Sequence, residues 1–196
     1  MNIAKTSIAM ALCSLFVASA SAQTTGTTVQ RDVNQQNRIE QGLQSGSLST
    51  GEAAKLEGQE SKVEKMQTKD LQDGKQSPAE KARLDKAQDN VSTDIHRDKN
   101  NAVAGNPNSA SSKRMQADLQ RNANQQARIE QGVQSGQLTN HQTGKLERGQ
   151  SHVTHKEAQA GTNGHVNASE QANVQAREDH QSGRIYVKKH DEITKQ

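Results

Sequence analysis

The chain has 196 residues, and 25 Lys and Arg against 22 Asp and Glu give a formal net charge of +3 at pH 7. Only 29% of its residues are hydrophobic and 1% are aromatic, so few large side chains can each contribute the roughly 1.5–3 kcal/mol of a fully buried one. Its single cysteine, Cys13, excludes an intramolecular disulfide. This composition favours self-contained helices with a marginal core and partly disordered segments.

Residues 1–22 have the pattern of a signal peptide. Lys5 precedes the apolar run Ile8–Val17, and Ala20-Ser21-Ala22 forms a small-x-small cleavage site before Gln23. The apolar run is too short to span a membrane. We therefore expect a periplasmic or secreted protein without a membrane span, cleaved near Ala22–Gln23.

The sequence repeats itself at an offset of ninety residues: NQQNRIEQG at 34–42 returns as NQQARIEQG at 124–132. Repetition at a fixed period predicts repeated structural units. The segment 102–112 is small and polar, contains Gly105 and Pro107, and is typical of a flexible linker. We therefore expect two units that move independently: helical repeat 1 at 23–101 and helical repeat 2 at 113–191, with a tail at 192–196.

Turn and cap signals divide each repeat into three antiparallel helices. Each turn dipeptide is followed by a residue pair at capping-box spacing. The turns are Ser45-Gly46, Asp73-Gly74, Ser135-Gly136 and Asn163-Gly164, and the caps are Ser49 with Glu52, Ser77 with Glu80, Thr139 with Gln142 and Asn167 with Glu170. The predicted fold is all-α, with helices at 28–44, 50–71 and 77–100, then at 115–134, 140–160 and 167–190.

Two narrow apolar stripes run along helices of the first repeat. One consists of Leu56, Val63 and Met66, and the other of Leu84, Val91 and Ile95. Their spacing of three, four and seven places each set on one helix face. These stripes predict seams of the core. In an alternative reading, they pair with a protein partner or with a second copy of the chain.

Two of the turns resemble the second half of an EF-hand loop. The matching segments are DGKQSPAE at 73–80 and SGSLSTGE at 45–52, each with a central glycine and a terminal glutamate. An EF-hand would imply calcium binding, and the resemblance implies degenerate EF-hand-like repeats, with weak or no calcium binding, in a small exported bacterial-type protein. The opening ligand positions hold Lys69 and Leu71 in one loop and Gln41 and Leu43 in the other, in place of carboxylates. Calcium is therefore not expected, and a capped helix–turn–helix explains the same residues.

Histidine is concentrated in the second repeat. Six of the seven histidines lie there, and His152 and His155 are three residues apart, on one face of a predicted helix. With His165 and His180 they are candidate ligands for zinc, copper or nickel. Where repeat 1 has Met66 and Leu71, repeat 2 has Lys156 and Gly161, so metal binding could compensate for lost core. The other reading is that these histidines are exposed residues of a solvated helix.

Catalytic patterns are missing from the sequence: it has no phosphate-binding glycine loop and no nucleophile in a recognisable context. We therefore expect a protein that is not an enzyme. Nucleic acid is not an expected partner, because acidic and basic residues are interspersed along the chain. Two functional classes remain: an exported binding protein of the metal-handling or stress type, and a structural or interaction module.

Overall fold

The computed structural model describes residues 16–191, with side chains described from Thr25 onward. This part of the chain is helical and contains no strand, which confirms the all-α prediction. Most of the predicted signal peptide and the tail lie outside it, and the first helix runs across the predicted cleavage site at Ala22–Gln23. The helices are α1 (Phe16–Ser45), α2 (Thr50–Asp70), α3 (Pro78–Lys99), α4 (Ala110–Gln134), α5 (Asn140–Gly161) and α6 (Ala168–His190).

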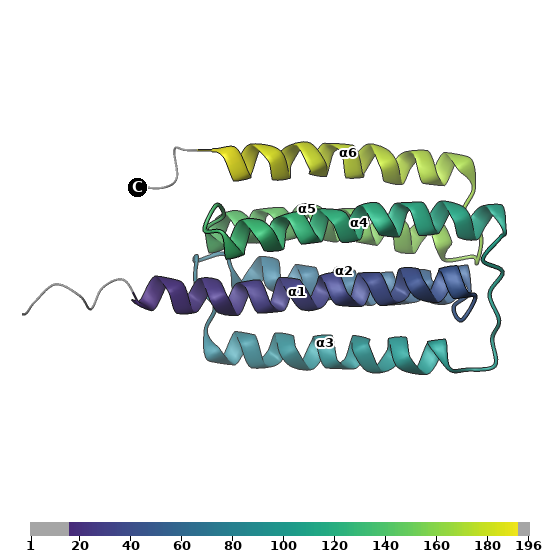
Figure 1. Ribbon diagram of the computed structural model, residues 1–196, viewed down its shortest axis with the longest axis horizontal. Coiled ribbons are helices and arrows are strands. Elements are labelled where there is room, and N and C mark those ends of the chain that lie inside the picture. The colour runs from purple at the N-terminus through teal and green to yellow at the C-terminus, as the bar shows by residue number, and fades with distance from the viewer. Residues whose placement is uncertain (1–15, 192–196) are drawn as a thin grey trace, which may run out of the picture.

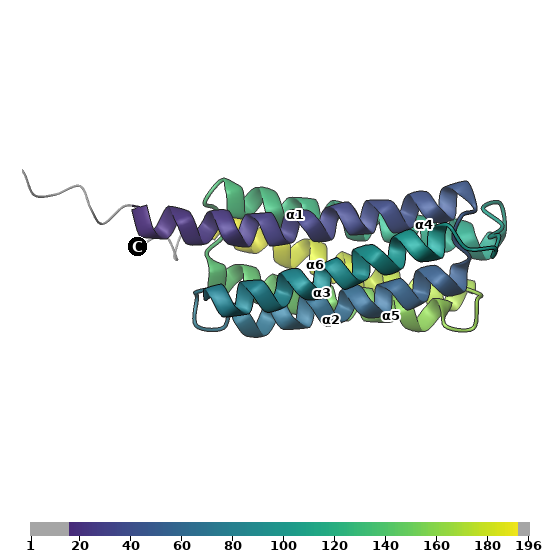
Figure 2. The same ribbon diagram turned by 90° about the horizontal axis from the view of Figure 1, so that it is seen from below.

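The six helices form an elongated bundle in which every helix runs along the long axis (Figure 1). In its middle, α1 lies beside α4 and α2 lies beside α5, and these two pairs have the most extensive packing in the structure. The outer helices cover opposite sides: α3 packs on α1 and α2, and α6 packs on α4 and α5 (Figures 1 and 2). The chain therefore has a four-helix centre with one helix on each flank.

The predicted turns and helix starts are confirmed. The glycines of all four predicted turn dipeptides have φ between 70° and 80°, the left-handed region in which glycine is least strained. Each of the four predicted caps forms a complete capping box, in which the cap side chain and the third helical residue satisfy one another's backbone N–H groups. Local sequence chemistry therefore determines where α2, α3, α5 and α6 begin.

The connection between the halves is shorter than predicted and is held in place. Helix α4 begins at Ala110, within the predicted 102–112 linker, because Ser109 caps it. The Gly105 N–H donates to the Gly46 carbonyl at 2.8 Å, which ties the connection to the α1–α2 turn. One buried apolar cluster contains Leu56 of α2 together with Leu119 of α4. Independent movement of the halves, as expected from the sequence, would expose this shared core.

The predicted apolar stripes lie inside this core. Leu56, Leu84 and Ile95 are completely buried, and Met66 is partly buried against the same cluster. A partner that paired through these stripes would have to displace the chain's own helices. The stripes therefore serve the fold.

Gly161 contributes no side chain where its counterpart Leu71 is buried, but it is a packing residue. A Cβ added at Gly161 would lie 2.7 Å from the Cβ of Ala54 on α2. At the matching contact, a Cβ added at Gly144 would lie 2.9 Å from the Cβ of Leu71. Glycine at these two positions lets α5 approach α2 closely.

Polar groups connect α2 and α5 at the centre of their contact. The Ser61 hydroxyl donates to the Ser151 carbonyl at 3.0 Å, and the Thr154 hydroxyl donates to a Glu64 carboxyl oxygen at 3.0 Å. In both pairs the partners are ninety residues apart, so each residue meets its own counterpart. The two helices therefore cross where their sequences correspond.

The four central helices bury an unusual number of carboxyl groups. Glu57, Glu60 and Glu64 of α2 are at most 1% exposed, and no hydrogen-bond partner reaches either carboxyl oxygen of Glu60. Most of the available partners are uncharged, as when the Gln36 side-chain amide donates to Glu57 at 3.0 Å. Six of the buried acids of these helices are Asp32, Glu57, Glu60, Glu64, Glu147 and Glu157, and we refer to these six below as the core carboxyls.

Burial raises the pKa of every core carboxyl, because an ionised oxygen loses water without gaining a matching cation. The pKa of Glu57 rises to about 8 and that of Asp32 to about 7. Burial also raises the pKa of Glu157, and its neighbour Glu57 raises it further by like-charge repulsion. At pH 7 Glu57 is therefore mostly a neutral carboxylic acid and Asp32 is near the midpoint of its titration, and burial favours the neutral form of the other four.

Acids and amides exchange places between the halves of the core. In the first half, Gln67 of α2 donates to Asp32 of α1. Ninety residues later, Asn122 of α4 donates to Glu157 of α5 at 2.6 Å. Each half thus keeps one carboxyl and one carboxamide at this contact, with the two roles exchanged. A protonated carboxyl side chain and the corresponding carboxamide differ only in having a hydroxyl or an amino group, so the same packing is retained.

We expect the protein to lose stability as the pH rises from about 4.5 to 8. A carboxyl whose pKa is higher in the folded state holds more protons there than in the unfolded chain, so deprotonation favours unfolding. Each such group lowers the free energy of unfolding by about 1.4 kcal/mol per pH unit between its unfolded and folded pKa values. Urea denaturation followed by circular dichroism across this range measures the slope.

The variant Glu57→Gln isolates one core carboxyl in this experiment. Between about pH 4.5 and 8 it should reduce the slope of the free energy of unfolding against pH by about 1.4 kcal/mol per pH unit, the contribution of one proton, because the amide cannot ionise. The matched control is Asp89→Asn, which removes a carboxyl that is 69% exposed and pairs with Arg31 outside the core. It should flatten the slope less than Glu57→Gln does. A wild-type stability that stays level or increases over this range would contradict the proposed neutral core.

Candidate functional site

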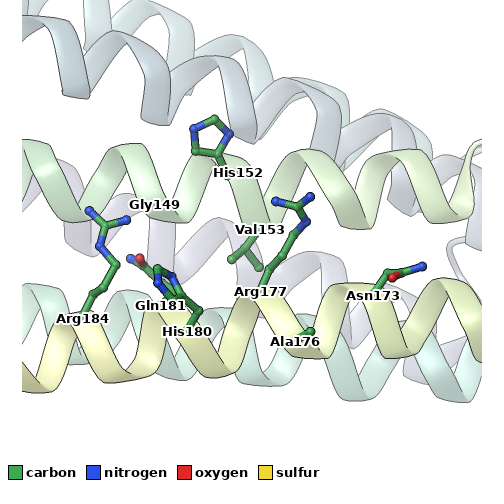
Figure 3. Close-up of a pocket in the computed structure, with 9 residues that line it drawn as sticks. All are labelled: Gly149, His152, Val153, Asn173, Ala176, Arg177, His180, Gln181 and Arg184. Atoms are coloured by element: carbon green, nitrogen blue, oxygen red, sulfur yellow. The ribbon is translucent and has the colours of Figure 1, made fainter.

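A groove of about 490 Å³ lies between α5 and α6 (Figure 3). His152 projects from α5 and His180 from α6, while Arg177 and Arg184 extend from α6 toward α5 (Figure 3). The lining contains these four basic side chains and no aspartate or glutamate. Its remaining residues are Gly149, Val153, Asn173, Ala176 and Gln181.

The matching position between α2 and α3 is bridged by side chains. There the Gln59 amide of α2 donates to Asp94 of α3 at 2.8 Å. Ninety residues later, Gly149 stands in place of that glutamine and Arg184 in place of that aspartate. The bridge is lost, and the two helices leave an open space at this position. One half of the chain therefore has a groove where the other half has a hydrogen bond.

Loss of the side chain at position 149 opens the groove. A Cβ added to Gly149 would lie 2.0 Å from the Gln181 side-chain oxygen and 2.6 Å from an Arg184 guanidinium nitrogen. Gln181 occupies the floor, where its amide donates to the Leu146 carbonyl at 2.9 Å. Arg184 donates to the Lys145 carbonyl at 2.9 Å, which holds its guanidinium across the groove. The absence of a side chain at Gly149 therefore leaves room for the Gln181 amide and the Arg184 guanidinium.

The charge of the groove favours an anion over a cation. Arg184 hydrogen bonds a neutral carbonyl, and no ion pair is recorded for Arg177 among the described residues. An approaching metal ion would meet the repulsion of two guanidinium groups, whereas a carboxylate or phosphate would be attracted by both. The planar guanidinium also offers paired donors that match such groups.

The predicted histidine set is divided among three places. His152 and His180 share the α5–α6 groove, whereas His155 lines a different groove between α2 and α5. His165 lies in the turn before α6, where its N–H donates to the Asn163 side chain at 2.9 Å. Within residues 16–191, no group of three or more His, Cys, Asp or Glu side chains is arranged to hold a metal ion. Transition-metal binding by these histidines stays a prediction.

The EF-hand-like turns use their terminal glutamates as helix caps. A Glu52 carboxyl oxygen accepts from the Ser49 backbone N–H at 2.9 Å, and a Glu80 oxygen accepts from the Ser77 N–H at 2.8 Å. These contacts are those of the capped helix–turn–helix that the sequence also predicted.

Neither arginine of the groove was a candidate site residue from the sequence: Arg177 was not considered, and Arg184 was interpreted with Lys188 and Lys189 as a basic cluster that suits a helix C-terminus. Arg177 and Arg184 lie seven residues apart on α6 and so share a helix face. An available signal was the comparison at ninety residues, in which Ala87, Asn90 and Asp94 are replaced by Arg177, His180 and Arg184. Only the histidine of this set was taken as a candidate.

Comparison with the models of known protein families found no match. Comparisons with curated proteins and with solved structures found no significant match either. Among the described residues, no helix is both long and apolar enough to cross a membrane.

We expect Gly149→Ala to destabilise the protein, because the new methyl group displaces the buried Gln181 amide from its bond to Leu146. The loss of a hydrogen bond of this kind costs roughly 0.5–1.5 kcal/mol, which a urea titration resolves. The matched control is Gly183→Ala on the open side of α6, where an added Cβ meets nothing within 4 Å. That change should stabilise the helix by roughly 0.5–1 kcal/mol. Equal effects of the two substitutions would contradict the packing described for Gly149.

Proposed function

We propose that this protein is a non-enzymatic, exported binding protein whose α5–α6 groove takes a small anionic ligand. The ligand class is a compound with two or more carboxylate or phosphate groups. The observation that carries the proposal is the groove itself, which has two arginines, two histidines and no acidic side chain in its lining. Export rests on the signal-peptide pattern of residues 1–22.

The difference between the halves supports a selected function for the groove. The Gln59–Asp94 hydrogen bond joins α2 to α3. If the corresponding residues of α5 and α6 only maintained the fold, the same hydrogen bond would serve there as well. In the other half, three α6 positions gained Arg177, His180 and Arg184 together with the opening at Gly149. These four differences all lie in one open, basic groove, which is better explained by a bound ligand than by unselected substitutions at the surface.

Transition-metal binding is the alternative function of the same groove. It is favoured by the presence of His152 and His180 in one lining, since imidazole suits zinc, copper and nickel. Two side chains do not complete a coordination sphere, so water or a bound carboxylate would have to supply the remaining ligands. The metal reading therefore needs zinc or copper to bind despite the charges of Arg177 and Arg184.

We also infer that the chain consists of two copies of one three-helix unit that have become a single bundle. Equivalent hydrogen bonds support this organisation: Arg38 donates to the Ser92 hydroxyl at 2.6 Å, and Arg128 donates to the Ser182 hydroxyl at 2.7 Å. The framework is thus shared between the copies, while the grooves differ. On this view, one copy supplies support and the other the ligand site.

The ligand class can be tested with citrate and pyrophosphate as probes, by calorimetry on the purified protein. We expect both anions to bind, and Arg177→Gln to weaken binding by at least about tenfold, because a charged hydrogen bond contributes roughly 1.5–3 kcal/mol. The matched control is Lys86→Gln, which removes an exposed positive charge from the flank helix α3. It should leave the affinity unchanged.

The same calorimetry with zinc and copper as ligands distinguishes metal binding from anion binding. Metal binding that is abolished by His152→Ala and His180→Ala, in a protein that binds neither citrate nor pyrophosphate, would overturn the anion proposal and support metal handling. Equal weakening of anion binding by Arg177→Gln and Lys86→Gln would show that the anions respond only to net charge, which would also overturn it.

A further inference from the structure

Acidic and basic side chains of α2 and α5 are separated in space, although they alternate along the sequence. The acids Glu57, Glu60 and Glu64 point into the core, while all four lysines of α2 are exposed. On α5 both glutamates, Glu147 and Glu157, are buried. The face that α2 and α5 present to solvent therefore carries their bases without their acids, apart from the half-buried Glu52. Its basic residues are Lys55, Lys62, Lys65, Lys69, Lys145, Arg148 and Lys156, and we refer to it as the α2–α5 face.

The α2–α5 face is hollowed along the contact between its two helices. A groove of about 540 Å³ lies there, with Lys55, Lys62 and Lys65 on the α2 side and His155 on the α5 side. Its floor consists of the small residues Gly51, Ala54, Gly58, Ser61 and Ala158. This groove is separate from the α5–α6 groove and shares no lining residue with it.

Little negative charge offsets the lysines of this groove. Lys55 lies 3.6 Å from Asp98 of α3. Lys62 and Lys65 have no recorded ion pair among the described residues. Burial lowers the pKa of His155, and the positive charges of Lys65 and Lys156 lower it further. The lysines thus add a positive potential at His155, although burial is the larger cause of the lowered pKa.

We infer that the α2–α5 face binds a linear acidic polysaccharide. A run of lysines along two adjacent helices of 21 and 22 residues, roughly 32 Å at 1.5 Å per residue, matches an extended chain of charges better than a single small anion. The lysine ammonium is a point charge that adapts to irregular spacing. The polymer carries the negative charge that the α2–α5 face lacks.

The uncharged groups of the groove select among polyanions. Gln59, Gln159 and Thr162 line it beside the lysines. Gln59 donates to Asp94, Gln159 accepts from Lys156, and Thr162 donates to the Ala158 carbonyl. The Gln59 and Thr162 oxygens can still accept from sugar hydroxyls, and the Gln159 amide can still donate to them. A phosphate chain offers only acceptors. Tyr186 lies on α6 outside this groove, and the His155 imidazole is the one ring among its lining residues, so successive bases would find no row of rings to stack on. A polysaccharide can therefore form more contacts with the uncharged groups of this groove than a nucleic acid can.

Heparin and polygalacturonate are suitable probes, because one is sulfated and the other carboxylated. We expect both to bind the purified protein, with an affinity that falls as salt rises. The double variant Lys62→Gln, Lys65→Gln should weaken binding by at least tenfold at low salt and reduce the salt dependence. The matched control replaces two exposed lysines elsewhere, Lys86→Gln on α3 and Lys113→Gln on α4, with the same change in net charge.

The inference uses residues other than the α5–α6 groove, so the two proposals can fail separately. Arg177→Gln should leave heparin binding unchanged within about twofold, whereas it weakens citrate binding. Equal weakening by the two lysine pairs, or tighter binding to DNA, polyphosphate or anionic lipid vesicles than to either polysaccharide, would overturn the inference. Circular dichroism of each variant verifies that the helices are retained.

Discussion

The burial of neutral carboxyl groups is the physical constraint on which this structure depends. The chain has too few large apolar residues for an ordinary core, and Glu, Gln, Asn and Thr fill the space between α1, α2, α4 and α5. An ionised glutamate in such a place would be strongly destabilising, whereas a protonated one behaves like glutamine. The exchange of Asp32–Gln67 for Asn122–Glu157 shows this equivalence within one molecule. The protons on the core carboxyls therefore contribute to the stability of the helix bundle.

The same constraint determines the surface. A carboxyl that keeps its proton in the core no longer offsets a lysine outside, so each neutral core acid adds one unit to the formal net charge of +3. The α2–α5 face is basic for this reason. A sequence-level comparison of Lys and Arg with Asp and Glu underestimates the positive charge that a ligand meets.

The helices were predictable because their signals are local. Ser49, Ser77, Thr139 and Asn167 begin helices through side-chain contacts within three residues, and the turn glycines need only their own backbone angles. The packing of α2 on α5 was not predictable in this way, because it depends on contacts between residues ninety positions apart, such as Ser61 and Ser151.

The polar core left a signal in the sequence that was not recognised. Glu57, Glu60 and Glu64 follow the three- and four-residue spacing of a core stripe, as Leu56 and Val63 do on the neighbouring face. Glutamate is normally assigned to the surface, so the lysines and glutamates of α2 were taken as one mixed solvated face. The same assumption affected the candidate site: the histidines were singled out, Arg177 was not considered, and Arg184 was assigned to a basic helix end.

The most direct measurement of the neutral core is the number of protons released when the protein unfolds at pH 7. Calorimetric unfolding in buffers of different ionisation enthalpy gives this number. The core carboxyls regain an ordinary pKa in the unfolded chain, so we expect more than one proton to be released per molecule, and fewer from Glu57→Gln. Unfolding without proton release would show that the core acids are already ionised in the folded protein, and would contradict this account of the bundle and of its basic surface.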